Sequence, residues 1–454
     1  MSAFDRAPFI AIWETTRACA LACVHCRAAA IPHRDPDELT TDEGRALIDR
    51  LAAFGPRPPL LVFTGGDPLR RPDIVELVAH ARARGLAPSL TPSGTAAATA
   101  ERLRALRDAG LMRLAVSLDG ASAESHDAFR GVRGSHRHTL AIVERARALG
   151  LPLQINTTVS SRTVADLPEL ARQVETFGVA LWALFFLIPV GRGRADEALG
   201  AEEIERVLGW AADLAARAPF GVKTTEAPHY HRVLAARGRA ADVAGRAGRA
   251  VTDGNGVLFV DHVGNICPSG FLPLVAGNVR RDDPVAVYRE HPLFALLRDP
   301  ARLGGRCGRC EHRERCGGSR ARAWALTGDP LADDPGCAYE PAPGAPRALP
   351  IAGGSDAPPA VTEAQVVQAL RAVFDPELGL SVVELGLVYG ITIERGVVAI
   401  TMTLTTPGCP IHDVMPAWVR EAVGALPGVE RVDVTLTFDP PWTPDRMTAP
   451  VARP

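Results

Sequence analysis

Short apolar runs alternate with amphipathic stretches from the N-terminal region to about Pro189. The apolar runs predict strands at Phe9–Thr15, Leu60–Thr64, Ala87–Thr91, Arg113–Leu118, Leu153–Val159 and Ala180–Ile188. The amphipathic stretches predict helices at Asp42–Phe54, Asp73–Arg84, Ala98–Ala109, Ser135–Leu149 and Val164–Phe177. Six such repeats with short connections predict an α/β fold in which helices cover parallel strands. Either a doubly wound sheet or a barrel fits this pattern.

The remaining sequence changes character several times. After the repeats of residues 1–200, residues 201–254 are rich in Ala and Arg and predict a helical connector. Residues 255–340 have shorter elements, many glycines and five cysteines. Pro, Ala and Gly dominate residues 341–360, which predicts a flexible linker. Residues 361–454 again alternate between helix and strand patterns and predict a separate α+β domain.

Composition narrows the classes of function. The 454 residues carry a formal net charge of −2, which gives no electrostatic reason to expect nucleic acid or an anionic membrane as a partner. The longest apolar run, Val179–Val190, is shorter than the ~20 residues of a membrane span, and the N-terminus lacks the pattern of a secretory signal. We therefore expect a cytoplasmic protein, in which the nine cysteines favour metal binding or catalysis over disulfides. Lys223 is the only lysine, which we interpret as composition bias.

Three cysteines follow the first predicted strand with the spacing Cys19-x3-Cys23-x2-Cys26. Thiolates are the usual ligands of iron–sulfur clusters, and three on one loop can hold three irons of a [4Fe–4S] cubane. The fourth iron is then open to bind a substrate, as a catalytic metal with an open position does. Two alternatives stay open at this point: three unrelated buried cysteines, or a zinc site that includes His25.

This loop and its surroundings, about residues 8–195, resemble the radical SAM superfamily. The family's fold is a partial (β/α)6 barrel, so the resemblance favours the barrel. It implies that the amino and carboxylate groups of S-adenosylmethionine (SAM) bind the open iron. An electron from the cluster then cleaves SAM to methionine and a 5′-deoxyadenosyl radical, which removes a hydrogen atom from a substrate. In this interpretation Cys19, Cys23 and Cys26 are the catalytic residues, and the protein orients the reactants and excludes water.

The resemblance also implies SAM contacts after the later strands. The turn that ends in Asp67 looks like the family's GGE motif for the SAM amino group, with Asp in place of Glu. The segment with Ser117 and Asp119 looks like the one that contacts the ribose. For Asn156 and Ile188, ordinary strand-end residues are an equally good interpretation. The complete set of implied contacts is Thr64, Gly65, Gly66, Asp67, Ser93, Ser117, Asp119, Asn156 and Ile188.

A second group of cysteines lies in residues 255–340, and this segment resembles the SPASM extension of radical SAM enzymes. The resemblance implies that four of them hold one auxiliary [4Fe–4S] cluster: Cys307, Cys310, Cys316 and Cys337. Arg320 stands where the full pattern has a further cysteine. Cys267, upstream, stays unassigned as a remnant, a ligand or a substrate-facing thiol. A structural zinc site also fits the spacing of the four cysteines.

Residues 362–445 resemble the MIP18/DUF59 family, which is linked to iron–sulfur cluster assembly. The matching segments include Asp375–Glu377, Glu384–Val388 and Thr405–Pro410. Cys409 lies at a predicted strand-to-helix turn, where a helix N-terminus favours a thiolate, so we predict a transient iron or cluster ligand. A packing cysteine at a tight turn is the alternative.

The segments Trp13–Cys19, Cys23–Ala28 and Phe185–Gly191 are most similar to the heme-biosynthesis branch of the superfamily. That branch modifies side chains of iron tetrapyrroles, including the oxidative decarboxylation of propionates. We therefore predict a radical SAM enzyme with a tetrapyrrole substrate, and a maturase of a ribosomal peptide or a protein side chain as the alternative. A third hypothesis is a non-catalytic iron–sulfur carrier or assembly factor. The expected partners are an electron donor such as ferredoxin or flavodoxin, and iron–sulfur assembly proteins.

Four polar residues lie outside these motifs. We interpret His126 and Arg130, after the fourth predicted strand, as surface residues, although they could contact a substrate. His229 and His231 are two residues apart and do not share a helix face. We interpret both as solvated loop residues, although a heme-like substrate would give them a role.

Overall fold

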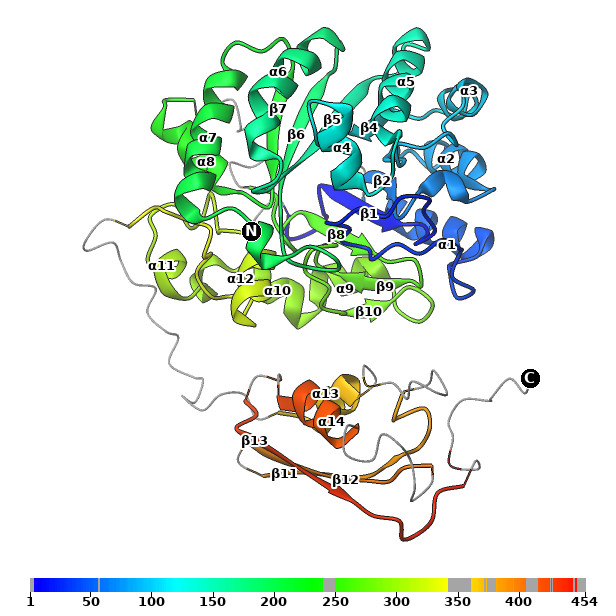
Figure 1. Ribbon diagram of the computed structural model, residues 1–454, viewed down its shortest axis with the longest axis vertical. Coiled ribbons are helices and arrows are strands. Elements are labelled where there is room, and N and C mark those ends of the chain that lie inside the picture. The colour runs from blue at the N-terminus through cyan, green and yellow to red at the C-terminus, as the bar shows by residue number, and fades with distance from the viewer. Residues whose placement is uncertain are drawn as a thin grey trace. The chain divides into compact units, whose positions relative to one another are not determined.

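The computed structural model describes residues 4–55, 58–239, 250–341, 361–370, 373, 381–394, 396–405, 415–424, 426, 428–443 and 446. The chain divides into two compact units, Met1–Leu349 and Pro350–Pro454 (Figure 1). Among the described helices, none has both the length and the apolar character that crossing a membrane requires.

Parallel strands in chain order form the centre of the first unit (Figure 1). They are β1 (Ile10–Glu14), β2 (Leu60–Thr64), β3 (Ala87–Leu90), β4 (Arg113–Ser117), β5 (Leu153–Val159) and β6 (Leu181–Phe186). Each pairs in parallel with the next, so the six predicted strands and the α/β fold class are confirmed. Residues from one face of every one of these strands line a single cavity, so the sheet curves around that cavity as a partial barrel.

Helices cover the outer face of this sheet. They are α1 (Thr41–Ala52), α2 (Ile74–Ala83), α3 (Ala100–Asp108), α4 (Ala123–Arg130), α5 (Ser135–Ala148), α6 (Leu167–Thr176), α7 (Ala201–Ala215) and α8 (His229–Ala236). Alternate strand residues such as Leu114 and Val116 point outward and are fully buried beneath the helices. Between them, Ala115 and Ser117 face the cavity. The period of two along a strand therefore separates the apolar core from the site.

Four strands outside the predicted repeats extend the sheet, and two of them pair in parallel with its edges. Residues 201–254, predicted as a helical connector, also contain β7 (Gly221–Thr225), which pairs in parallel with β6. The polar sequence of β7 hides the strand pattern, because its inward residues face a cavity rather than an apolar core. The cysteine-rich segment supplies β8 (Val257–Val260), which pairs in parallel with β1. This segment is therefore continuous with the barrel sheet.

The rest of the cysteine-rich segment is built from short elements. They are β9 (Asn265–Cys267), β10 (Gly277–Asn278), α9 (Pro284–Glu290), α10 (Pro292–Arg298), α11 (Gly305–Gly308) and α12 (Arg320–Thr327). Single 3-10 turns lie at Pro68–Arg70, Val164–Asp166, Ala195–Glu197 and Pro300–Arg302.

The second unit is α+β. Its sheet has the order β11 (Val388–Glu394), β12 (Val397–Met402) and β13 (Arg431–Leu436). The first pair is antiparallel and the second is parallel. Helices α13 (Glu363–Leu370) and α14 (Met415–Gly424) contribute apolar residues to its separate core.

Candidate active site

The loop after β1 that carries the first three cysteines is fixed by backbone hydrogen bonds. The amide of Cys19 donates to the carbonyl of Ile31 at 2.8 Å. Arg192, from the loop after β6, donates through Nε to the carbonyl of Cys23 at 2.9 Å and through its amide to the carbonyl of Cys26 at 3.0 Å. The loop is therefore held to the opposite end of the β1–β6 sheet, which presets the positions of the three thiols.

All three thiols line the same cavity, whose volume is about 1040 Å³. Polar hydrogens approach each sulfur. The amide of Leu21 donates to Cys19 Sγ at 3.3 Å, and the amide of Ala30 donates to Cys26 Sγ at 3.4 Å. Arg130 Nη1 lies 3.8 Å from Cys23 Sγ. Donors of this kind stabilise thiolates and the sulfurs of a bound cluster, so the loop fits a cluster site.

The two glycines after β2 pack against the cysteine loop. The amide of Gly66 donates to the carbonyl of Thr16 at 2.7 Å. Gly65 has a φ of +143°, and a Cβ there would lie 2.2 Å from the same carbonyl oxygen. A Cβ on Gly66 would lie 2.5 Å from the carbonyl oxygen of Ala18. Glycine is therefore required at both positions for the close approach of two backbone segments.

Asp67 does not line this cavity, in contrast to its predicted contact with the SAM amino group. Its carboxylate is fully buried and accepts hydrogen bonds from Thr95 Oγ1 at 3.0 Å, the amide of Leu69 at 3.1 Å and the amide of Ser93 at 3.4 Å. The geometry makes Asp67 a positioning residue for the loop that brings Ser93 to the thiols.

Asp119 does not line the cavity either, and its carboxylate pairs with Arg130, which does. The two form an ion pair, and Asp119 accepts a second hydrogen bond from the amide of Thr158 at 2.7 Å. Burial opposes ionisation of Asp119, but the charges around it, above all Arg130, outweigh burial and lower its pKa. The interpretation of Arg130 and His126 as surface residues is wrong, because His126 is buried and the side chain of Arg130 is only 12% exposed and lines the cavity.

The other residues predicted to contact SAM all line the cavity: Thr64, Gly65, Gly66, Ser93, Ser117, Asn156 and Ile188. Gln154 Nε2 donates to Asn156 Oδ1 at 2.6 Å, which fixes the orientation of that amide. These residues come from strand ends and loops of β2 to β6, so the fold brings them together with the thiols.

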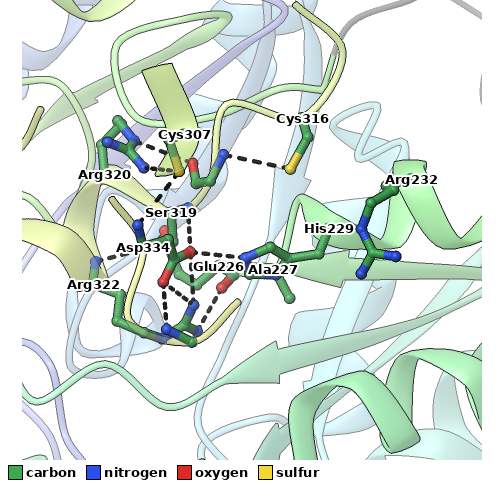
Figure 2. Close-up of polar contacts among 12 residues, drawn as sticks. Glu226, Ala227, His229, Arg232, Cys307, Cys316, Ser319, Arg320, Arg322 and Asp334 are labelled. Carbon is green, nitrogen blue, oxygen red and sulfur yellow. Dashed lines mark hydrogen bonds and ion pairs between the residues drawn. The ribbon is translucent and has the colours of Figure 1, made fainter. Parts of the chain in front are cut away.

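The second group of thiols also lies together. Burial raises the pKa of Cys307, Cys310 and Cys316, and the nearby Cys337 adds to the effect on each. Arg320, which stands in place of a further cysteine, directs Nη2 to Cys307 Sγ at 3.7 Å (Figure 2).

Backbone amides approach three of these sulfurs. The amides of His312, Gly318 and Asp334 donate to the sulfurs of Cys310, Cys316 and Cys307 at 3.4, 3.5 and 3.4 Å. Within the described ranges, no three His, Cys, Asp or Glu side chains are arranged to hold one metal ion. A cluster does not require such convergence, because its irons occupy separate corners. The donor set therefore fits an iron–sulfur cluster.

A buried polar network lies next to Cys307 of the second thiol group (Figure 2). Asp334 accepts from the amide of Ser319 at 2.7 Å and pairs with Arg322 Nη1 at 3.1 Å and His229 Nε2 at 3.0 Å. Ser319 Oγ donates to Glu226 Oε2 at 2.5 Å. Glu226 and Ser319 both line the cavity, so the network reaches from the cavity wall to the residue whose amide contacts Cys307.

His229 belongs to this network, so its interpretation as a solvated loop residue is wrong. The residue begins α8 and is only 1% exposed. Burial opposes its protonation, but Asp334 raises its pKa to about 9. On the cavity side, burial and then the charge of Asp253 raise the pKa of Glu226 well above its usual range. His231 was also interpreted as a solvated loop residue, but it lies on the same helix and lines the cavity.

Two predicted ligands lie apart from these groups or outside the described residues. Cys267 is buried at the end of β9, and burial, then Asp261, raises its pKa to about 12. Asp261, Arg27 and Glu14 are the charged neighbours that shift it, and no other described thiol is among them. Cys409 lies within residues 406–414, which are outside the described residues. The segment Asp375–Glu377 is also outside them.

Comparison with known proteins agrees with this arrangement. Residues 13–174 match the radical SAM superfamily. The AdoMet-dependent heme synthase of Methanosarcina barkeri is 40% identical over 349 residues, which cover 75% of this chain and 99% of that protein. The chain belongs to the radical SAM superfamily. The predicted enzyme class and the predicted cofactors, a [4Fe–4S] cluster and SAM, are therefore confirmed.

Further similarities concern the rest of the radical SAM part of the chain and, separately, the C-terminal domain. The pre-heme d1 synthase of Dinoroseobacter shibae is 32% identical over 351 residues, covering 72% of this chain and 85% of that protein. Streptococcus suis SuiB bound to S-adenosylmethionine has the same fold, with a TM-score of 0.59 and 14% identity over 74% of this chain and 78% of that chain. Residues 363–435 match the iron-sulfur cluster assembly protein family, which confirms the predicted family of the C-terminal domain.

Several residues of this radical SAM site carry no motif signal. Arg130 and Arg192 reach the cysteine loop from distant segments, and nothing in the local sequence distinguishes them from surface arginines. Glu226 has a φ of +59°, a conformation that sequence alone does not reveal for a glutamate. The sequence did offer one sign that Lys223 is special, because it is the only lysine among the 50 Lys and Arg residues.

Proposed function

We propose that this radical SAM enzyme modifies an iron tetrapyrrole by oxidative decarboxylation of propionate side chains. The observation that carries the proposal is the cavity of about 1040 Å³, which begins at the three thiols and continues along the inside of the barrel. Ligand pockets usually measure ~300–1,000 Å³, so this cavity has room for SAM beside a large substrate. The two relatives named for heme and pre-heme d1 synthesis support a tetrapyrrole as that substrate.

The residues divide into three tasks in this proposal. Cys19, Cys23 and Cys26 hold the cluster, and Arg130 and Arg192 fix their loop. The predicted contacts that line the cavity, from Thr64 to Ile188, hold SAM in a site that excludes water. When bound, the cluster and SAM together supply a radical that removes a hydrogen atom from the substrate.

Each conversion of a propionate to a vinyl group also releases CO₂ and one electron, because the hydrogen leaves as an atom. The enzyme therefore needs an electron acceptor near the cavity. The second thiol group supports an auxiliary [4Fe–4S] cluster in this role, held by Cys307, Cys310, Cys316 and Cys337. Its residues lie behind the wall formed by Ser319 and Glu226, directly next to the cavity.

Anaerobic turnover tests the function. The reconstituted protein is incubated with SAM, dithionite and iron coproporphyrin III, and the porphyrin is analysed by mass spectrometry. We expect each converted side chain to lose CO₂ and two hydrogens, when the product is compared with the porphyrin in its neutral acid form. One 5′-deoxyadenosine should form for each CO₂. Formation of 5′-deoxyadenosine with an unchanged porphyrin, in the presence of an electron acceptor, would contradict the tetrapyrrole substrate while leaving the enzyme class intact.

The C-terminal domain and the electron donor belong to the same proposal. A domain of the cluster-assembly family on the same chain would deliver iron–sulfur clusters to the two thiol groups, and a ferredoxin or flavodoxin would reduce the first cluster. Cluster occupancy in cells can be compared between the full chain and residues 1–344. Equal occupancy would contradict cluster delivery by the C-terminal domain.

A further inference from the structure

Two basic side chains, on two different strands of the barrel, line the cavity. Lys223 on β7 lies beside Ala183 of β6, which in turn lies beside Asn156 of β5, so the three residues share the inward face. Arg113 begins β4 and has the same orientation as Ala115, two residues later. Both basic residues line the cavity together with the thiols.

Neither basic side chain has a partner within the described residues. No ion pair or side-chain hydrogen bond joins Lys223 or Arg113 to another described group. Arg27 shows the contrast, since it also lines the cavity but pairs with Glu14 at 2.8 Å. A buried cation usually has a counter-ion, because its transfer from water is costly without one. The protein therefore leaves two positive charges available inside the cavity.

These two charges act on each other. Burial lowers the pKa of Lys223 to about 8, and the positive charge of Arg113 contributes to the decrease. Lys223 therefore stays largely protonated at neutral pH, although no acidic group compensates it. An anion placed between the two would relieve the repulsion and form charge-assisted hydrogen bonds. A planar guanidinium beside an ammonium is suited to a carboxylate.

We propose that Arg113 and Lys223 form a carboxylate-binding site that anchors the substrate inside the barrel. The ligand is a propionate of the tetrapyrrole, so this proposal rests on the proposed function and adds the residues that recognise the substrate. Anchoring one carboxylate at this site would hold the macrocycle in a fixed orientation in the cavity. The methionine carboxylate of SAM offers the same chemistry, so the experiment must distinguish the two sources.

The test uses the full-length, reconstituted protein under anaerobic conditions. Iron coproporphyrin III is titrated into the wild type, Lys223→Gln and Arg113→Gln, and binding is followed by the porphyrin absorption band. Each neutral variant should weaken binding about tenfold or more, since a hydrogen bond between charged groups contributes ~1.5–3 kcal/mol. The charge-conserving Lys223→Arg should stay within a few-fold of wild type. The control is Arg104→Gln, which removes an exposed charge on α3 and should leave affinity unchanged.

Two further arms identify the source of the carboxylate. The tetramethyl ester of the same porphyrin should bind the wild type and the neutral variants equally, because it carries no carboxylate. SAM affinity should be the same in all variants, which also shows that they are folded. Unchanged porphyrin affinity in both neutral variants would overturn the proposal, and so would a loss of SAM affinity alone. A wild type that does not bind iron coproporphyrin III would overturn the tetrapyrrole substrate as well.

Discussion

Arg130 Nη1 lies 3.8 Å from Cys23 Sγ, and the same guanidinium pairs with the buried carboxylate of Asp119. The contact joins α4 to the loop after β1, two segments that are far apart in sequence. It places one positive charge next to the site at which the enzyme must receive an electron. A positive charge near a redox centre favours its reduced form.

Removal of that charge should make the first cluster harder to reduce. We predict that Arg130→Met shifts its reduction potential to more negative values, as measured by an electron paramagnetic resonance titration. Arg130→Lys keeps the charge and should shift the potential less. An unchanged potential in Arg130→Met would show that the guanidinium does not act on the cluster electrostatically.

The same substitution should also destabilise the fold, because it leaves Asp119 buried without its partner. Removing one partner of a buried ion pair typically lowers the free energy of unfolding by ~3–5 kcal/mol. Denaturant unfolding of the variant would measure this loss. The double variant Arg130→Met/Asp119→Asn removes both charges and should recover much of this loss. If the double variant is no more stable than the single one, the ion pair is not the cause.

The second thiol group should account for half of the iron. Two [4Fe–4S] clusters correspond to about eight irons per chain, and Cys316→Ala should reduce the anaerobically measured content to about four. Cys267→Ala is the matched control, because Cys267 is buried on β9 away from the other described thiols. A loss of iron in Cys267→Ala equal to that in Cys316→Ala would contradict the assignment of the four ligands.

Porphyrin binding should weaken at alkaline pH. Lys223 has a pKa of about 8 because of burial and then the charge of Arg113, and its protonated form is the one that binds a carboxylate. Affinity for iron coproporphyrin III should therefore fall as the pH rises above about 8, whereas Lys223→Arg should show no such decrease. In Arg113→Gln the decrease should move to higher pH, because the neighbouring charge is gone. A pH dependence that is identical in wild type and Lys223→Arg would exclude Lys223 as its cause.

The network beside the second thiol group should respond differently to two isosteric changes. Glu226→Gln should cost less stability, because burial and then the charge of Asp253 raise the pKa of Glu226 and disfavour its charged form, which glutamine lacks. Asp334→Asn should destabilise the protein by ~3–5 kcal/mol, since it leaves Arg322 and His229 without their buried counter-ion. Thermal and denaturant unfolding of the two variants provide the comparison. Equal stability losses would contradict this assignment of charge.

The strands of the barrel were predictable because their buried residues alternate along continuous apolar runs. Strand β7 was not, since Lys223 and its threonine neighbours face a cavity, and a polar inward face gives no hydrophobic pattern. The thiol groups could be recognised from their spacing together with the resemblance to radical SAM and SPASM sequences, since spacing alone also fits zinc. The orientations of Asp67 and Asp119 could not, because Thr95 and Arg130, which bind them, come from other segments. The partner of His229 is likewise Asp334, which is distant in sequence, so the local sequence gives no sign of this buried pair.

SAM cleavage at the first thiol group can be measured directly. The protein, reconstituted with iron and sulfide under strictly anaerobic conditions, is reduced with dithionite in the presence of SAM, and 5′-deoxyadenosine is quantified. We predict that wild type and Cys316→Ala form it, whereas Cys23→Ala does not. Equal formation by Cys23→Ala, or none by a wild type that holds its full complement of iron, would contradict the account.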